Sequence, residues 1–133
     1  MLYMTDNIDL KTDSRIDSRI GSIRILYYNF KNSKNVDIII HGIININNIP
    51  DTHIEIYKED NVMIDNNIPC YLEKLFNKFN GIDSPMLSMD NQRLINKHNL
   101  HTSISVGDIV ELSFPELKKE LWVCKMVGWK QLT

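Results

Sequence analysis

The side chains that could do acid–base or metal chemistry are four histidines, two cysteines and 17 carboxylates. His98 and His101 are three residues apart, a spacing that can put two imidazoles on one face of a helix and suits zinc. No cysteine and no second histidine pair lies close to them, and His41 and His53 are distant along the chain. The sequence therefore predicts no metal site and no cofactor.

The residues that serve as nucleophiles in enzymes lack the partners that would activate them. Cys70 has no histidine near it in the sequence, and no serine stands in a glycine-flanked elbow. The five glycines are not grouped, which excludes a phosphate-binding glycine loop. An enzyme is therefore disfavoured. The alternative, a small enzyme or nucleic-acid-processing factor, would need a site assembled from scattered acidic residues and histidines, with His41, His53, His98 and His101 as the candidates.

Two tryptophans near the C-terminus are the candidate binding residues, because tryptophan is enriched at the energetic centres of protein interfaces. Tryptophan is also common in the core of a domain of this size, so the strand alternation around Trp122 leaves open which face is buried. The loop over 115–120 lies beside Trp122 in the sequence and can present apolar side chains outward. The predicted binding surface consists of Trp122, Trp129, Pro115 and Leu117.

Length and charge exclude several classes of protein. A chain of 133 residues fits one domain, 1–133, in which residues 1–12 form a loosely held N-terminal arm. The net charge of −2 does not indicate nucleic-acid binding, which calls for a basic excess. No apolar run is long enough for a signal peptide or a membrane span, so we expect a cytoplasmic protein without membrane contact.

The two cysteines, Cys70 and Cys124, are far apart, and each lies in an apolar stretch. Two such cysteines are typical of buried thiols in a reducing compartment, and not of a disulfide framework. We therefore expect both thiols to be buried and unreactive, with no disulfide between them.

Residue usage is strongly skewed, with 20 isoleucines, 15 asparagines and no alanine. Folding does not explain this skew, because alanine is the best helix former and is normally among the commonest residues. Isoleucine and asparagine have A/T-rich codons, whereas alanine requires G or C at two codon positions. The composition therefore indicates an AT-rich genome, and many phages and plasmids of low-GC hosts have such genomes.

The elements that must position these residues follow one another in blocks. Strands are predicted over 22–30, 36–41, 53–58, 109–114 and 121–127, with the first two joined as a hairpin. Helices are predicted over 69–80, where Leu72, Leu75, Phe76 and Phe79 form one apolar stripe, and more weakly over 88–98, where Ser88 caps the helix. This order predicts an α+β fold, a mainly antiparallel sheet with one clear amphipathic helix and one weaker helix packed on it.

Residues 69–132 carry a pattern that is similar to a known group of proteins. A helix ending in Phe79-Asn80 is followed by the motif Ser103-x-Ser105-Val106-Gly107-Asp108 and by a closing Gly128-Trp129. This order resembles the YodL-like group of small proteins and domains from phages and conjugative elements of low-GC bacteria. The chain departs from the group at Thr102, where serine is usual, at Trp129, where phenylalanine is usual, and in a longer insert over 80–99.

The resemblance implies a habitat and no reaction, because the group has no agreed catalytic residues to carry over. In physical terms the motif predicts a structural role: Gly107 supplies an unusual backbone conformation and Asp108 caps the turn. The favoured hypothesis is a non-enzymatic accessory protein of a phage or mobile element. It would bind a host protein or defence complex stoichiometrically, as an anti-CRISPR or anti-restriction inhibitor does.

Overall fold

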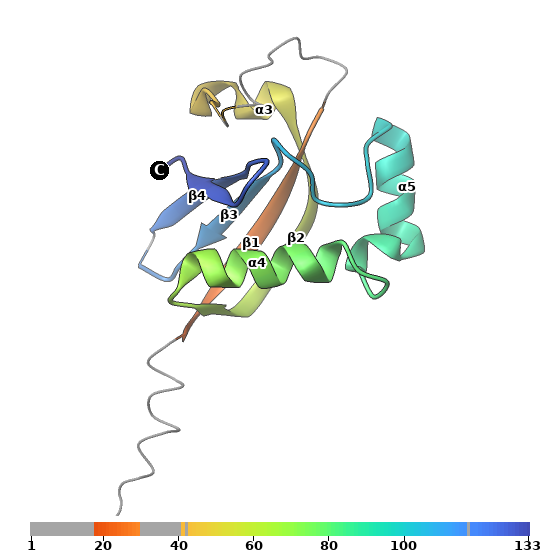
Figure 1. Cartoon of the computed structure of the whole chain (residues 1–133). Helices are drawn as coiled ribbons and strands as arrows, with labels where there is room; N and C mark the ends of the chain where they lie inside the picture. The colour runs from red at the N-terminus through yellow and green to blue at the C-terminus, as the bar shows by residue number, and fades with distance from the viewer. Residues whose placement is uncertain (1–17, 30–40, 42, 117) are drawn as a thin grey trace, which may run out of the picture.

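The computed structural model describes residues 18–29, 41, 43–116 and 118–133, and these form a five-stranded sheet with helices packed on it (Figure 1). All strand pairs are antiparallel, and the strand order is β2-β1-β3-β4-β5. The predicted α+β class is confirmed. The strands are β1 (Ser18–Tyr28), β2 (His53–Asp65), β3 (Ile109–Ser113), β4 (Lys119–Cys124) and β5 (Trp129–Gln131). The helices are α3 (Ile49–Thr52), α4 (Ile68–Phe79) and α5 (Met89–His98), with short 3-10 turns η2 (Ile46–Asn48) and η3 (Pro85–Leu87).

Helix α4 lies across one face of the sheet, as its sequence predicts (Figure 1). Leu72, Leu75 and Phe79 are buried, and Phe76 is half-buried against the same core. The Asn67 side chain accepts a hydrogen bond from the backbone N–H of Cys70, which caps the N-terminus of α4. The apolar stripe therefore does what its spacing indicates: it covers the sheet.

Helix α5 confirms the weaker of the two helix predictions. It also argues against His98 and His101 as a zinc-binding pair on one helix. The Ser88 hydroxyl accepts a hydrogen bond from the Asn91 backbone, so Ser88 is the N-cap. The helix ends after His98 because Asn99 adopts the left-handed conformation, at φ 54. His101 therefore lies beyond the helix, and the two imidazoles do not share one helical face.

The two faces of the sheet differ in what covers them. Under α4 and α5 lies the main core, to which all strands except β5 contribute buried side chains, among them Ile23, Ile56, Val110, Leu112 and Cys124. Among the described residues, the opposite face is covered at one end only, by the segment around α3, through a small cluster of Leu26, Ile49, Ile109 and Val123. At the other end of this face, the half-buried Arg24 lines a hollow and makes ion pairs with Glu55 and Glu111.

Strand β2 corrects the sequence prediction, which ended this strand at Lys58. It continues to Asp65, and its second half is mostly exposed, so no buried alternation marks it in the sequence. Two register shifts interrupt its pairing with β1, and each inserts one extra residue on β2. Asn61, in the first of these bulges, has a positive φ of 57.

Four other predictions either need correction or concern residues that the structure does not describe. The partner strand predicted over 36–41 lies outside the described residues except for His41, and the neighbours of β1 in the sheet are β2 and β3. Strand β4 begins at Lys119, so the predicted loop over 115–120 is shorter than expected. Cys70 is exposed, which contradicts its predicted burial, because it lies outside the apolar stripe of α4, whereas Cys124 is buried. The arm predicted over 1–12 is not among the described residues.

Within the part of the chain that the structure describes, no helix is long and apolar enough to cross a membrane.

Candidate functional site

The hairpin of β4 and β5 brings the two predicted tryptophans onto one face of the sheet. Trp129 pairs with Cys124, and Trp122 lies two residues before Cys124 on the same strand. Because side chains alternate along a strand, Trp122, Cys124 and Trp129 all point toward the helix-covered face. Both indoles are half-buried and pack against the edge of the main core. The predicted alternation of Trp122 with its neighbours is confirmed.

The turn of this hairpin carries large apolar side chains in solvent. Gly128 has a positive φ of 73, which permits the bend, and the backbone N–H of Lys125 donates to the carbonyl of Gly128 at 2.9 Å. Met126 and Val127, between these residues, are 70% and 88% exposed. The half-buried tryptophans and this turn together form an apolar surface, named here the hairpin surface: Trp122, Met126, Val127 and Trp129.

The indole of Trp122 is held in place by a polar contact. Its Nε1–H donates to Oε1 of Glu120 at 3.0 Å, and Glu120 is largely buried. A buried carboxylate with an indole partner costs less than one without, so the pair stabilises the indole in this position. This hydrogen bond therefore fixes the orientation of one indole of the hairpin surface.

Pro115, the third predicted binding residue, lies elsewhere. It follows β3, at the end of β4 that is remote from the turn at Gly128, and is exposed. There it lines a hollow of about 210 Å³ together with Ile20 and Phe114. Leu117 lies outside the described residues. The structure therefore joins Trp122 to Trp129 but separates both from Pro115.

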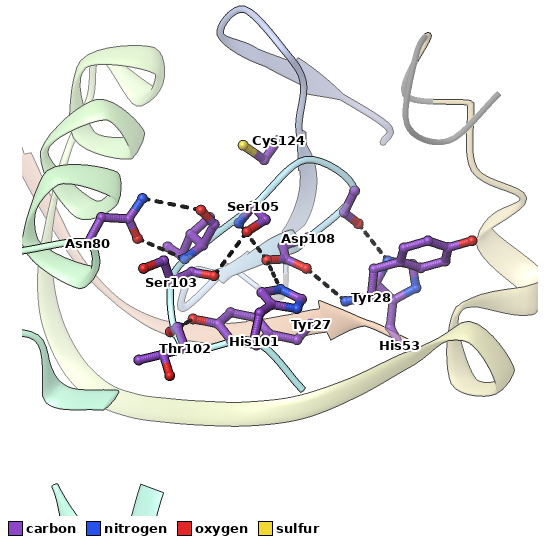
Figure 2. A network of polar contacts seen from close by, with 12 residues as sticks. Tyr27, Tyr28, His53, Asn80, His101, Thr102, Ser103, Ser105, Asp108 and Cys124 are labelled. Atoms are coloured by element: carbon purple, nitrogen blue, oxygen red, sulfur yellow. Dashed lines mark hydrogen bonds and ion pairs between the residues drawn. The ribbon is translucent and has the colours of Figure 1, made fainter. Parts of the chain in front are cut away.

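A second candidate is a polar network around Asp108 (Figure 2). The sequence pointed to Asp108 as the cap of this turn and to His53 and His101 as candidates, but it did not show that they meet. The Asp108 side chain is almost fully buried at the start of β3. Its Oδ1 accepts a hydrogen bond from the backbone N–H of Tyr28 at 2.8 Å. Its Oδ2 accepts hydrogen bonds from the backbone N–H of Ser105 and from Nε2 of His101, both at 2.7 Å. One carboxylate thus ties the loop before β3 to the end of β1.

In the same network, the partly exposed His101 packs against Tyr27, which is fully buried. Their rings are stacked at 4.4 Å with an angle of 12° between the planes. The Tyr27 hydroxyl donates to the carbonyl of Thr102 at 2.5 Å. Asn80, at the end of α4, bonds both the N–H and the carbonyl of Ile104 (Figure 2). The loop is therefore held by a helix, two strands and its own backbone.

His53, at the start of β2, contacts the same turn. Its Nε2 lies 2.8 Å from the carbonyl of Gly107, whose φ of 95 fits the predicted special role of this glycine. Its Nδ1 lies 2.7 Å from Oγ1 of Thr52, and the same Oγ1 lies 3.1 Å from the carbonyl oxygen of Asn48. Two of the four histidines named as candidates thus hold adjacent residues, Gly107 and Asp108.

Burial controls the protonation of these groups. It raises the pKa of Asp108 above its ordinary value, although the donors from His101 and from the backbone of Tyr28 and Ser105 oppose the shift. Burial lowers the pKa of His53, against the effect of its bond to Gly107. Burial, followed by the charge of Asp108, raises the pKa of the Cys124 thiol to about 12, so this thiol stays protonated and unreactive at neutral pH.

In chemical terms the network contains one acid–base pair, His101 with Asp108. Both oxygens of Asp108 are committed to backbone donors that fix the loop, which indicates a structural clasp. Among the described residues no three His, Cys, Asp or Glu side chains gather as ligands for a metal. His41 and His98 take no part in the clasp, whose histidines are His53 and His101.

Comparison with known proteins gives one match and no function. No family model matches the chain, and no solved structure matches it. An uncharacterized protein of Acanthamoeba polyphaga mimivirus is 39% identical over 61 residues, which are 46% of this chain and 52% of the relative. The chain thus spans about half the length of the curated relative it matches. The match gives limited support to a viral origin.

Proposed function

We propose that this chain is a viral accessory protein that acts by stoichiometric binding to a host protein, with the hairpin surface as its contact. The observation that supports this most is the grouping of Trp122 and Trp129 beside Met126 and Val127, which are 70% and 88% exposed. Aromatic side chains and methionine are enriched where proteins bind one another. Exposed apolar patches with polar surroundings are typical of such sites.

The support for a viral or mobile-element origin comes from the sequence and not from the structure. The viral relative, the AT-rich composition and the resemblance of residues 69–132 to the YodL-like group favour a protein of a virus or mobile element. Inhibition of a host defence is the effect that we propose for this binding. The viral relative does not indicate that the target is CRISPR or restriction machinery. The target therefore has to be identified by experiment.

A titration with full-length protein tests stoichiometric action. A host protein retained by the immobilised chain is purified and mixed with increasing amounts of it. Complex formation, and any inhibition, should saturate near one-to-one. Inactivation of a large excess of the target would mean turnover, and the proposal would fail.

A matched pair of variants tests the contact surface. Trp129→Ala should weaken binding by about 2 kcal/mol or more, roughly 30-fold in Kd, as is usual for a hot-spot aromatic. Tyr71→Ala is the control, because Tyr71 is a half-buried aromatic of α4 that lies near Tyr57 and Glu59 on the β2 side. Equal losses in both variants would contradict the hairpin surface as the contact.

The alternative of an enzyme rests on one observation, the half-exposed His101 beside Asp108. If His101 were a general base, His101→Gln would abolish activity while the protein stayed folded. If the pair is a clasp, the same variant should lower stability and leave the affinity for the partner nearly unchanged. We favour the clasp, because three donors converge on Asp108.

A further inference from the structure

The backbone of β5 faces two ways, and its register shows which residues face outward. The backbone N–H of Leu132 donates to the carbonyl of Leu121 at 2.7 Å, and Lys125 N–H donates to Gly128 at 2.9 Å. In an antiparallel pair, alternate residues bond to the neighbouring strand. Gly128, Lys130 and Leu132 therefore direct their backbone groups toward β4.

Trp129 and Gln131 consequently direct their N–H and carbonyl groups away from β4. Within the described residues β5 is the last strand at this end of the sheet. The outward backbone groups thus lie at the rim of the hairpin surface, beside the indole of Trp129. An edge strand with outward donors and acceptors is a template for one more strand.

The hairpin also differs in charge from the rest of the chain. Residues 118–133 hold four lysines and one glutamate, so their net charge is +3, while the remaining residues sum to −5 of the total of −2. The one acid, Glu120, is largely buried and bonded to Trp122. Lys130 on β5 itself is exposed. Lys118 and Lys119 lie at the far end of β4, whereas Lys125 lies in the turn and Lys130 on β5. These two lysines make the β5 edge basic, so it would attract a segment that carries acidic side chains.

We propose that the outer edge of β5 binds an acidic, extended segment of the partner protein as an added antiparallel or parallel strand. This inference rests on the proposed function and specifies how the partner is recognised. Backbone bonds to Trp129 and Gln131 would supply affinity, Lys125 and Lys130 would select for acid, and the tryptophans would receive apolar side chains.

A second copy of the chain is the competing occupant, because β2 is an edge strand with an acidic balance. Residues 53–65 contain four acids and one lysine, a net charge of −3. Two bulges interrupt β2, however, and a bulged edge resists further pairing. The structure therefore favours a segment of another protein.

The test removes one outward backbone N–H from β5. Gln131→Pro removes the outward N–H of β5, while the bonds to β4, which come from Lys130 and Leu132, remain. Gln131→Ala is the matched control, because it removes the side chain and keeps the N–H. The probe is a peptide of alternating glutamate and valine, with an N-methylated version that cannot donate. Binding is followed by amide chemical shifts of the full-length protein at low salt.

We expect the peptide to bind with a Kd below about 1 mM and to change the amide chemical shifts of residues 129–131. Its affinity should fall at least tenfold with Gln131→Pro or when the peptide is N-methylated. Gln131→Ala should bind like the wild type. Absence of binding, equal binding by Gln131→Pro, or shifts confined to 53–65 would overturn strand addition. So would concentration-dependent self-association that Gln131→Pro abolishes, because the occupant would then be a second copy.

The partner separates this inference from the proposed function. A host partner that still binds Gln131→Pro but not Trp129→Ala would overturn strand addition and keep the hairpin surface. A host partner unaffected by both variants would overturn the two together.

Discussion

The two edges of the sheet are built on opposite principles. Strand β2 is long, acidic and bulged, and the helix–strand contacts of α3, α4 and α5 concentrate on it. Strand β5 has three residues, belongs to a basic hairpin and lies beside half-buried tryptophans at the margin of the core. Packing and bulges protect the first edge from further pairing. The second edge is short, which limits its pairing with long strands. It can still pair with a short partner segment.

The largest expected difference between the two regions is in stability. Leu75→Ala should lower the free energy of unfolding by about 2–5 kcal/mol, because the side chain is buried where α4 covers the sheet. Trp129→Ala should cost about 1 kcal/mol or less, because Trp129 is only half-buried. Urea denaturation of both variants gives the comparison. If Trp129→Ala costs as much as Leu75→Ala, the hairpin surface is core and not a contact.

A smaller loss is expected where the clasp joins the two regions. Asp108→Asn replaces one acceptor oxygen by a donor that faces the N–H of Ser105 or Tyr28, and should cost about 1–3 kcal/mol. Asp83→Asn is the control, since Asp83 is exposed, and should change stability by less than about 0.5 kcal/mol. Equal denaturation midpoints for both variants would show that the clasp contributes nothing.

The β2 side should also make stability depend on pH through His53. Burial lowers the pKa of His53 in the folded state below its ordinary 6.5, so the unfolded state takes up the proton first as pH falls. Its contribution is therefore full above pH 6.5 and declines below it, by at most about 1.4 kcal/mol per pH unit. His53→Gln should show a flatter profile between about pH 7 and 5. Thermal denaturation at several pH values measures it, and an unchanged slope would exclude His53 as the cause.

The smallest expected effect tests charge at the two edges. Lys130→Glu should weaken partner binding about tenfold at low salt, because it reverses a charge on β5. Asp60→Lys, a reversal on exposed β2, should leave affinity within about twofold. Calorimetry with the purified partner compares them. A larger loss with Asp60→Lys would move the contact to the opposite edge.

Local patterns in the sequence were enough for α4, α5 and most strands, but not for the short helix α3. The apolar stripe of α4 and the Ser88 cap of α5 depend on neighbours within one or two turns, and both predictions are confirmed. The second half of β2 was missed because an exposed edge strand has no buried alternation to reveal it. The predicted burial of Cys70 was wrong because apolar neighbours in sequence do not fix the face on which a helical residue lies.

The sequence by itself determined the α+β class, the helical stripe and the special backbone at Gly107, since each follows from residue type and short spacing. Only the tertiary structure decided which side chains meet. Asp108 bonds Tyr28 across 80 residues, and His53 reaches Gly107 across 54, contacts that exist only because β1 lies between β2 and β3. It likewise placed Trp122 with Trp129 and set Pro115 apart, because strand pairing, and not distance along the chain, determines which residues become neighbours.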